Sequence, residues 1–175
     1  MNIVIPTLAP DEVEKALPQL VALFQDAIAS GAALGFLPPL TEAAAQQFWR
    51  GVQASVAAGQ TLLFVARDTA SGDVLGTVQL QLAPQSNGRH RAEVAKMMVH
   101  TRARRQGIGR LLLQALQERA AAIGRTTLVL DTRQGDAAEQ LYQSVGFRVS
   151  GVIPDYAESA DGSLHATVVY FKLLR

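Results

Sequence analysis

A basic segment with two glycines, residues 104–110, has the composition of an anion-binding turn. It follows an apolar run that ends at Val99, and helical spacing of apolar residues begins at Ile108. Glycine lets the backbone approach a ligand closely, and the first turn of a helix presents unpaired N–H groups with a partial positive charge. Because phosphate binds such helix ends and several arginines surround this one, these residues predict a diphosphate ligand.

Two common diphosphate motifs do not match this segment. A P-loop requires Lys and then Ser or Thr after its second glycine, whereas Arg110 and Leu111 follow Gly109. A dinucleotide fingerprint requires a third glycine where the chain has Leu112. Two glycines in a loop are also explained by a purely structural turn. The surrounding sequence is needed to distinguish such a turn from a diphosphate-binding one.

Two motifs in the surrounding sequence resemble those of the GNAT acyl-CoA N-acetyltransferases. Residues 104–109 (RRQGIG) fit the pattern R/Q-x-x-G-x-G/A, and residues 138–147 (AEQLYQSVGF) resemble A-x-x-L-Y-x-x-x-G-F. They occur in the family's order, with an expected strand between them. The resemblance implies the GNAT fold, an α/β arrangement of mixed α+β type, and acetyl-CoA as cosubstrate.

Further segments resemble the tabtoxin-resistance branch of that family. They cover residues 31–36, 91–99, 130–142 and 151–174, which together with the two motifs extend over most of the chain. This likeness implies that the acceptor is a primary amine of a small compound, such as a tabtoxinine-β-lactam-like antimetabolite, and that the function is toxin resistance. In the family, the second helix and the loop before it form one wall of the acceptor pocket, although Trp49 on that helix also suits the core.

The family resemblance also implies where acetyl-CoA binds. Two neighbouring parallel strands, here residues 92–99 and 127–131, diverge, and the pantetheine lies between them. Backbone groups at the end of the first strand pair with the pantetheine amides, and N–H groups of the basic turn hold the pyrophosphate. The cofactor-binding residues expected on this basis are Met97, Met98, Val99, Arg104, Arg105, Gln106, Gly107, Ile108, Gly109 and Arg110.

Transfer to an amine requires groups that remove a proton from the ammonium and protonate the departing thiolate. Glu93 and Asp131 are the expected carboxylates, since each belongs to one of the two diverging strands and the tabtoxin-resistance branch has acidic residues there. The resemblance assigns the thiolate to Tyr142. Structural alternatives exist for each: Glu93 as a salt-bridge partner of the basic residues 89–91, Asp131 as a turn residue, and Tyr142 as a half-buried aromatic.

Direct attack in a ternary complex is expected, because the chain has no cysteine and no Gly-x-Ser-x-Gly nucleophile motif. No metal site is expected, since His100 and His165 lack further ligands at suitable spacing, and both are assigned structural or exposed roles. Many family members have an asparagine where this chain has Gly135. The following Asp136 is expected to cap the next helix.

The elements that must position these groups alternate in type along the chain. The expected order is β, α, α, β, β, β, α, β, α, β, β, in which residues 62–66 and 74–82 form an antiparallel hairpin. Pro18 is expected near the start of the first helix, and Thr41 is expected to cap a second helix that ends near Ala58. This order predicts a mixed, mostly antiparallel sheet with splayed parallel strands 4 and 5, flanked by helices.

Length, composition and charge indicate the number of domains, the kinds of partner and the location of the protein. The 175 residues suit a single GNAT domain over residues 1–175, and 49% hydrophobic residues suffice for a core. The net charge of +1 argues against a nucleic-acid or membrane partner. The first fifteen residues lack a signal-peptide pattern and no apolar run is long enough to span a bilayer, so a cytoplasmic protein is expected.

Three other interpretations remain open at this point. The acceptor amine could belong to a protein or peptide, the chain could bind acyl-CoA without catalysis, or the arginine-rich turn could bind nucleic acid. Family members commonly associate through sheet edges, so a homodimer is also expected.

Overall fold

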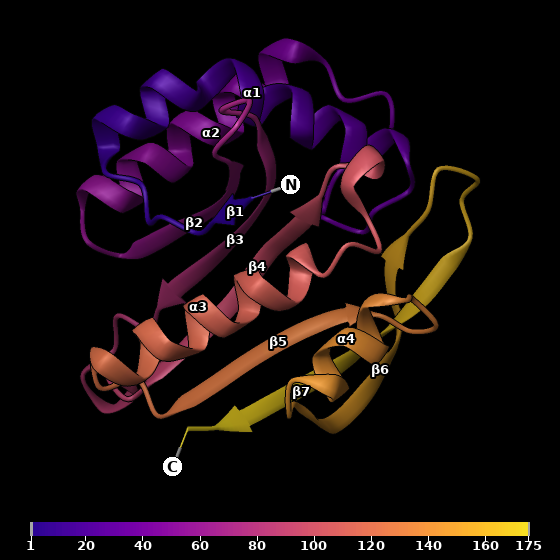
Figure 1. Ribbon diagram of the computed structural model, residues 1–175. Coiled ribbons are helices and arrows are strands. Elements are labelled where there is room, and N and C mark those ends of the chain that lie inside the picture. The colour runs from indigo at the N-terminus through magenta and orange to yellow at the C-terminus, as the bar shows by residue number, and fades with distance from the viewer. Residues whose placement is uncertain (1, 175) are drawn as a thin grey trace.

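The computed structural model describes residues 2–174, which form a seven-stranded sheet with helices on both faces (Figure 1). The predicted order of elements is confirmed. The strands are β1 (Ile3–Val4), β2 (Thr61–Asp68), β3 (Val74–Leu82), β4 (Arg91–Val99), β5 (Thr127–Arg133), β6 (Arg148–Glu158) and β7 (Leu164–Leu173). The helices are α1 (Pro10–Ala29), α2 (Glu42–Ala57), α3 (Ile108–Ala122) and α4 (Ala138–Ser144), with 3₁₀ turns at Ser86–Gly88 and Thr101–Ala103.

The sheet has the order β1-β2-β3-β4-β5-β7-β6, and only β4 and β5 are parallel neighbours. The mixed, mostly antiparallel sheet and the β2–β3 hairpin are therefore confirmed. The last three strands are longer than expected, because β5 pairs with β7 as far as Arg133, opposite Thr167. These extra residues reach past Asp131, which lies within β5 and not at a turn.

Two clusters of buried side chains cover the two faces of the sheet. One contains residues of α3 and α4 such as Leu112 and Tyr142, and the other contains residues of α1 and α2 such as Phe24 and Trp49. No helix within residues 2–174 is long and apolar enough to cross a membrane. Each face of the sheet thus carries its own helical layer.

The predicted position of Pro18 near a helix start is wrong, because α1 is continuous from Pro10 to Ala29 and Pro18 lies inside it. Proline in a helix interior costs about 3 kcal/mol and removes one backbone donor. Pro18 is exposed, and so is Glu14, whose carbonyl loses its helical partner. Buried residues on both sides of it, including Val13 and Leu20, keep the helix intact. By contrast, the Thr41 cap is confirmed, since its hydroxyl accepts from the Ala44 N–H at 3.2 Å.

Trp49 fastens α2 to α1 and offers a test of this packing. Its side chain is fully buried and its Nε1 donates to the Leu20 carbonyl at 2.9 Å. We expect Trp49→Phe to lower the free energy of unfolding by about 1–3 kcal/mol, since it removes this hydrogen bond and leaves a small void. Urea unfolding measures the effect. Arg50→Gln, at an exposed neighbouring position, should change stability by less than about 0.5 kcal/mol; equal losses in the two variants would contradict the prediction.

Candidate active site

The parallel strands β4 and β5 stay paired for only a short distance. Their register joins Arg91, Ala92 and Glu93 to residues 127–129, and no pairing between the two strands continues beyond this point. The rest of β4 keeps its bonds to β3 on the other side, where Val99 lies opposite Gly76. The predicted splay is therefore present, and Met97, Met98 and Val99 lie on its β4 side.

A β-bulge distorts β4 within this open region. Two residues of β4, Lys96 and Met97, face one residue of β3, and Lys96 has a left-handed backbone with φ of 51°. The extra residue reverses the faces of the strand. Val94 packs with α3, whereas Met98, an even number of positions later, belongs to the cluster beneath α1 and α2. Regular alternation along the sequence does not predict this reversal.

The basic turn ends in the N-terminus of α3, as the sequence predicts. Gly107 has φ of 79° and occupies the N-cap position, and Leu111 is the first residue whose N–H bonds back into the turn, at Gly107. The N–H groups of Ile108, Gly109 and Arg110 therefore have no partner within the helix. These amides form an anion-binding end beside the opening between β4 and β5.

The side chains of the turn differ in their contacts. Arg104 bonds to the Val99 carbonyl at 3.0 Å and to the Ser30 hydroxyl at 2.6 Å, which ties the turn to β4 and α1. Gln106 donates to the Arg102 carbonyl at 3.3 Å, and Arg110 donates to Ser144 in α4 at 3.1 Å. Arg105 has φ of 62° and is exposed. Arg104 thus acts as a structural tie, and Arg105 remains exposed at the helix end.

Gly109 allows α3 to start close to its neighbours. A Cβ atom at this position would lie 2.8 Å from both Leu141 Cδ2 and Met97 Cε. Such contacts are too short for a side chain, so the glycine brings the helix end against α4 and β4. The amides of the turn are thereby brought up to the splayed strands.

A cavity of about 690 Å³ opens beside the splay, between β4, β5, the hairpin of β6 and β7, and the loop of residues 32–37. All three predicted catalytic residues line it: Glu93 from β4, Asp131 from β5 and Tyr142 from α4. Lys96 and Arg133 line the same cavity. The structure therefore brings together two carboxylates, a phenol and two cations at the point where the strands separate.

The charges in this cavity influence one another. Burial raises the pKa of Glu93 above its usual value, the Asp131 carboxylate raises it further, and Lys96 opposes the shift. Lys96 itself has a pKa lowered by burial, and its ammonium donates to the Leu34 carbonyl at 2.7 Å. Asp131 is fixed by the buried Thr167, whose hydroxyl donates to Oδ2 at 2.8 Å. Burial and the neighbouring Asp131 thus favour protonation of Glu93, and the hydrogen bond from Thr167 anchors Asp131.

Tyr142 is 7% exposed, and this small exposed part belongs to the cavity. Its ring lies 6.0 Å from Phe147 and 6.2 Å from Tyr170, measured between centroids. Burial raises the pKa of its hydroxyl, and the negative charges of Asp131 and Asp136 raise it further. The hydroxyl therefore stays protonated over the whole range in which enzymes work, and it is suited to donate a proton or a hydrogen bond.

Other sequence-based assignments have mixed outcomes. The Asp136 cap is wrong: α4 has Ala137 at its N-cap without a side-chain bond, and the Glu139 carboxylate instead accepts from the Gly135 N–H at 2.6 Å. Trp49 belongs to the core, as expected.

The sequence did not predict two charged residues that line the cavity. Arg133 shares a strand face with Asp131 and would have followed from a longer β5, whereas Lys96 depends on a bulge that the sequence does not signal.

Comparison with known proteins gives consistent matches. Residues 59–149 match the family model described as an acetyltransferase (GNAT) domain. The L-methionine sulfoximine/L-methionine sulfone acetyltransferase of Pseudomonas paraeruginosa (strain DSM 24068 / PA7) is 31% identical over 158 residues, which are 90% of this chain and 89% of the relative.

Solved structures share the whole fold. An N-acetyltransferase from Staphylococcus aureus Mu50 superposes with a TM-score of 0.81 at 23% identity, covering 100% of both chains. The acetyltransferase yncA from Salmonella typhimurium, solved with its cofactor acetyl-CoA, has a TM-score of 0.78 at 18% identity over 100% of this chain and 95% of its own. The chain therefore belongs to the GNAT family, and it is an acyl-CoA N-acetyltransferase, an enzyme that uses acetyl-CoA as acetyl donor.

Proposed function

We propose that this enzyme acetylates the primary amine of a small, amino-acid-like compound by direct attack, with both substrates bound together. The observation that carries the proposal is the cavity in which Glu93, Asp131 and Tyr142 meet beside the splayed strands. The Pseudomonas relative, whose name gives L-methionine sulfoximine as its substrate, supports an amino-acid antimetabolite as acceptor. Tabtoxinine-β-lactam is a compound of the same kind.

Three features of the splay fit acetyl-CoA. The facing edges of β4 and β5 are unpaired beyond Glu93, which leaves the edge of β4 at Met97, Met98 and Val99 open to the pantetheine amides, although the Val99 carbonyl already accepts from Arg104. The free N–H groups at the start of α3 suit the pyrophosphate. Met97 connects the two features to the cavity, since it lines the cavity and lies against Gly109 at the start of α3. When bound there, acetyl-CoA supplies an activated acetyl thioester.

Three side chains that line the cavity have different roles in the proton transfers. Glu93 takes a proton from the acceptor ammonium, because burial and the nearby Asp131 carboxylate raise its pKa and so favour its protonation. Asp131, held by Thr167, orients the ammonium by accepting a second hydrogen bond from it. Tyr142 donates its phenolic proton toward the departing sulfur. The ammonium thus loses one proton to Glu93 and the thiolate gains one from Tyr142, and the second proton that the nitrogen loses as the amide forms restores the phenol.

The test combines binding and turnover. Calorimetry with acetyl-CoA should show binding that CoA competes for, and release of the free thiol should depend on a small primary amine. Methionine sulfoximine and other amino acids are compared with N-terminal and lysine-containing peptides. Faster turnover of peptides would transfer the proposal to protein amines, and the absence of acetyl-CoA binding by folded protein would refute it.

We also propose that β6 mediates a homodimer. This strand is the edge of the sheet and is exposed along all of Arg148–Glu158, with Val149, Val152 and Ile153 each at least 45% exposed. An exposed apolar edge strand is a template for pairing, and antiparallel pairing with itself creates two-fold symmetry. Sedimentation should therefore show a dimer that Val152→Lys dissociates; a monomer at every concentration would contradict this.

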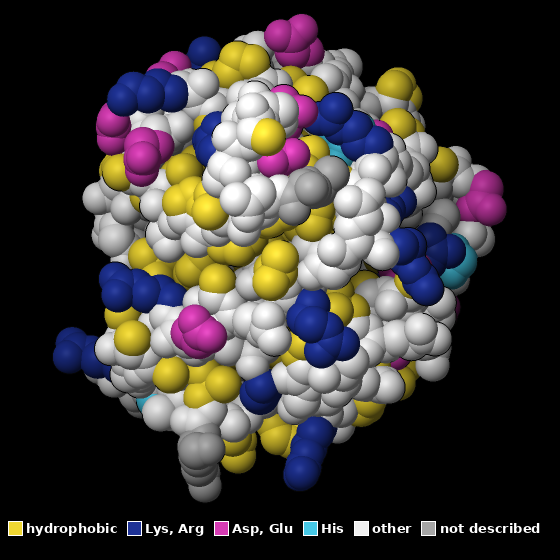
Figure 2. All heavy atoms as spheres, in the orientation of Figure 1, with side chains coloured by type: hydrophobic (Ala, Val, Ile, Leu, Met, Phe, Trp, Pro, Cys, Tyr) yellow, Lys and Arg dark blue, Asp and Glu magenta, His cyan; other side chains and the backbone are white. Residues whose placement is uncertain are grey.

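Basic residues do not form a continuous surface on the face shown in Figure 2. Lys and Arg side chains are dispersed there among acidic and uncharged ones. A nucleic-acid site requires clustered positive charge, so this face gives no support to the interpretation of the arginine-rich turn as a nucleic-acid-binding element.

A further inference from the structure

Arg133 carries a positive charge into the cavity without a carboxylate partner. It is half-buried and lines the cavity together with Glu93 and Asp131. Among residues 2–174, no carboxylate lies within 4 Å of its guanidinium; the ion pairs found there involve Lys15, His100 and Arg102. A guanidinium in a partly desolvated site is suited to bind a carboxylate in a bidentate manner.

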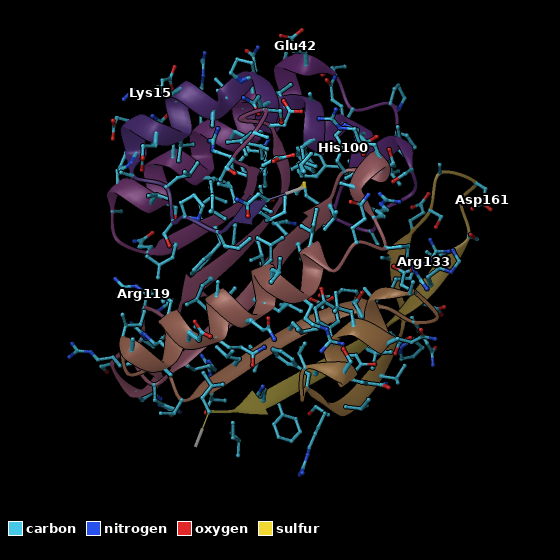
Figure 3. All side chains as sticks on the ribbon, viewed as in Figure 1. Lys15, Glu42, His100, Arg119, Arg133 and Asp161 are labelled. Carbon is cyan, nitrogen blue, oxygen red and sulfur yellow. The ribbon has the colours of Figure 1, made fainter. Side chains whose placement is uncertain are left out.

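Neighbouring groups orient this guanidinium, and its charge acts on the Asp136 carboxylate without forming a direct ion pair. Nη2 of Arg133 lies 2.7 Å from Nε2 and 3.1 Å from Nδ1 of His165 in β7. Ser163 lies 2.9 Å from the same Nε2 and donates to the Asp161 carboxylate at 2.6 Å. Arginine keeps its charge in proteins, so these contacts hold the guanidinium of Arg133 in place and leave it a cation. Figure 3 shows Arg133 near the base of the β6–β7 hairpin, whose tip carries Asp161.

The other charges lining the cavity are already in use or have the wrong sign. Lys96 donates to the Leu34 carbonyl and is influenced by both Glu93 and Asp131. Asp136 and Glu158 are acidic and do not attract an anion. Arg133 is therefore the cation of this cavity that is available to an anionic group of the substrate.

The spacing along β5 suits a compound with an ammonium and a carboxylate on neighbouring atoms. Asp131 and Arg133 are two residues apart on one face of a strand, which separates their Cα atoms by about 6.6 Å. An ammonium between Glu93 and Asp131 thus leaves a carboxylate on the adjacent carbon within reach of the arginine side chain. Simple amines offer nothing to this second position.

We propose that Arg133 binds the α-carboxylate of the acceptor, so that the enzyme selects α-amino acids over amines that lack this group. The inference rests on the proposed function and makes it more specific. It assigns the ammonium to the carboxylates of β4 and β5, and the carboxylate to the end of β5. The side chain of the amino acid is then left to the loop of residues 32–37, which closes the other wall.

Matched acceptors test this assignment. L-methionine sulfone is compared with 3-(methylsulfonyl)propan-1-amine, tyrosine with tyramine, and histidine with histamine, each pair differing only in the carboxylate. Arg133→Gln should raise KM for the amino acids by about 10- to 100-fold, as expected for the loss of a charged hydrogen bond, and leave the amines unchanged. Arg133→Lys should recover part of the preference, because it restores the charge without the bidentate geometry.

Arg119→Gln is the control, since it removes the same charge from an exposed position near the other end of α3 (Figure 3). Acetyl-CoA affinity and melting temperature show whether each variant is folded. Equal losses for both members of a pair, or a wild-type enzyme without preference for the carboxylate, would overturn the role of Arg133 and leave the acetyltransferase intact. Failure of the wild type to acetylate any amine would instead refute the proposed function, and this inference with it.

Discussion

Glu93→Gln is expected to lower kcat by about 10²- to 10⁴-fold, the usual contribution of a general base. Acetyl-CoA affinity should remain unchanged, because the side chain lines the acceptor cavity and the cofactor is held by backbone groups of β4 and α3. Saturation kinetics by thiol release and calorimetry separate the two effects. Glu118→Gln, an identical change at an exposed position of α3, serves as control.

Glu93→Gln should lose activity but gain stability at neutral pH. Because the pKa of Glu93 is raised in the folded state, ionisation of this carboxyl opposes folding, and stability falls as pH rises from the unfolded-state pKa through the folded-state pKa. Glu93→Gln removes that loss. Its melting temperature should exceed that of the wild type at about pH 7, and the gain should vanish at about pH 3, where the carboxyl is protonated in both states. A destabilised variant at neutral pH would show that the carboxylate is structural.

Asp131 adds a second, independent readout. Its negative charge raises the pKa of Glu93, so Asp131→Asn should move the acid limb of kcat/KM to lower pH in addition to lowering the rate. A rate loss without this shift would indicate that Asp131 itself is the base. A shift without a large rate loss would leave Glu93 as the base and reduce Asp131 to an electrostatic neighbour.

The sequence predicted the parts of this site that depend on local patterns. The glycines at 107 and 109, the helix start at Ile108 and the order of strands follow from residue type and period, and the structure has them where expected. These features arise within one element or between neighbours in sequence. The two sequence motifs are also local, since one covers the turn before α3 and the other covers α4.

Features that depend on partners distant in sequence could not be predicted in this way. The bulge at Lys96 lies where β4 remains paired with β3 but has separated from β5. The side chains of β4 change from one face of the sheet to the other at this bulge. The extension of β5 to Arg133 depends on pairing with β7. Burial likewise outweighs local preference at Pro18, inside α1. Two of these three departures place a charged side chain in the acceptor cavity.

Tyr142→Phe is the second variant with a large expected effect, a fall in kcat of about 10²-fold. Phenylalanine preserves the ring contacts with Phe147 and Tyr170, so the change removes the hydroxyl alone. The hydroxyl stays protonated because burial and the charges of Asp131 and Asp136 raise its pKa. Its loss leaves the departing thiolate without a donor, whereas binding of acetyl-CoA and of the amine should change little.

Tyr170→Phe provides the comparison, since this tyrosine belongs to the same cluster but points its hydroxyl elsewhere. Its OH donates to the Glu139 carboxylate at 2.5 Å and accepts from Gln143 at 3.3 Å. We expect this variant to lose stability and to keep its kcat, the reverse of Tyr142→Phe. If Tyr142→Phe retained kcat within about two-fold under saturating substrates, the sulfur would have to leave without help from this residue, and the donor would have to be a backbone amide or water.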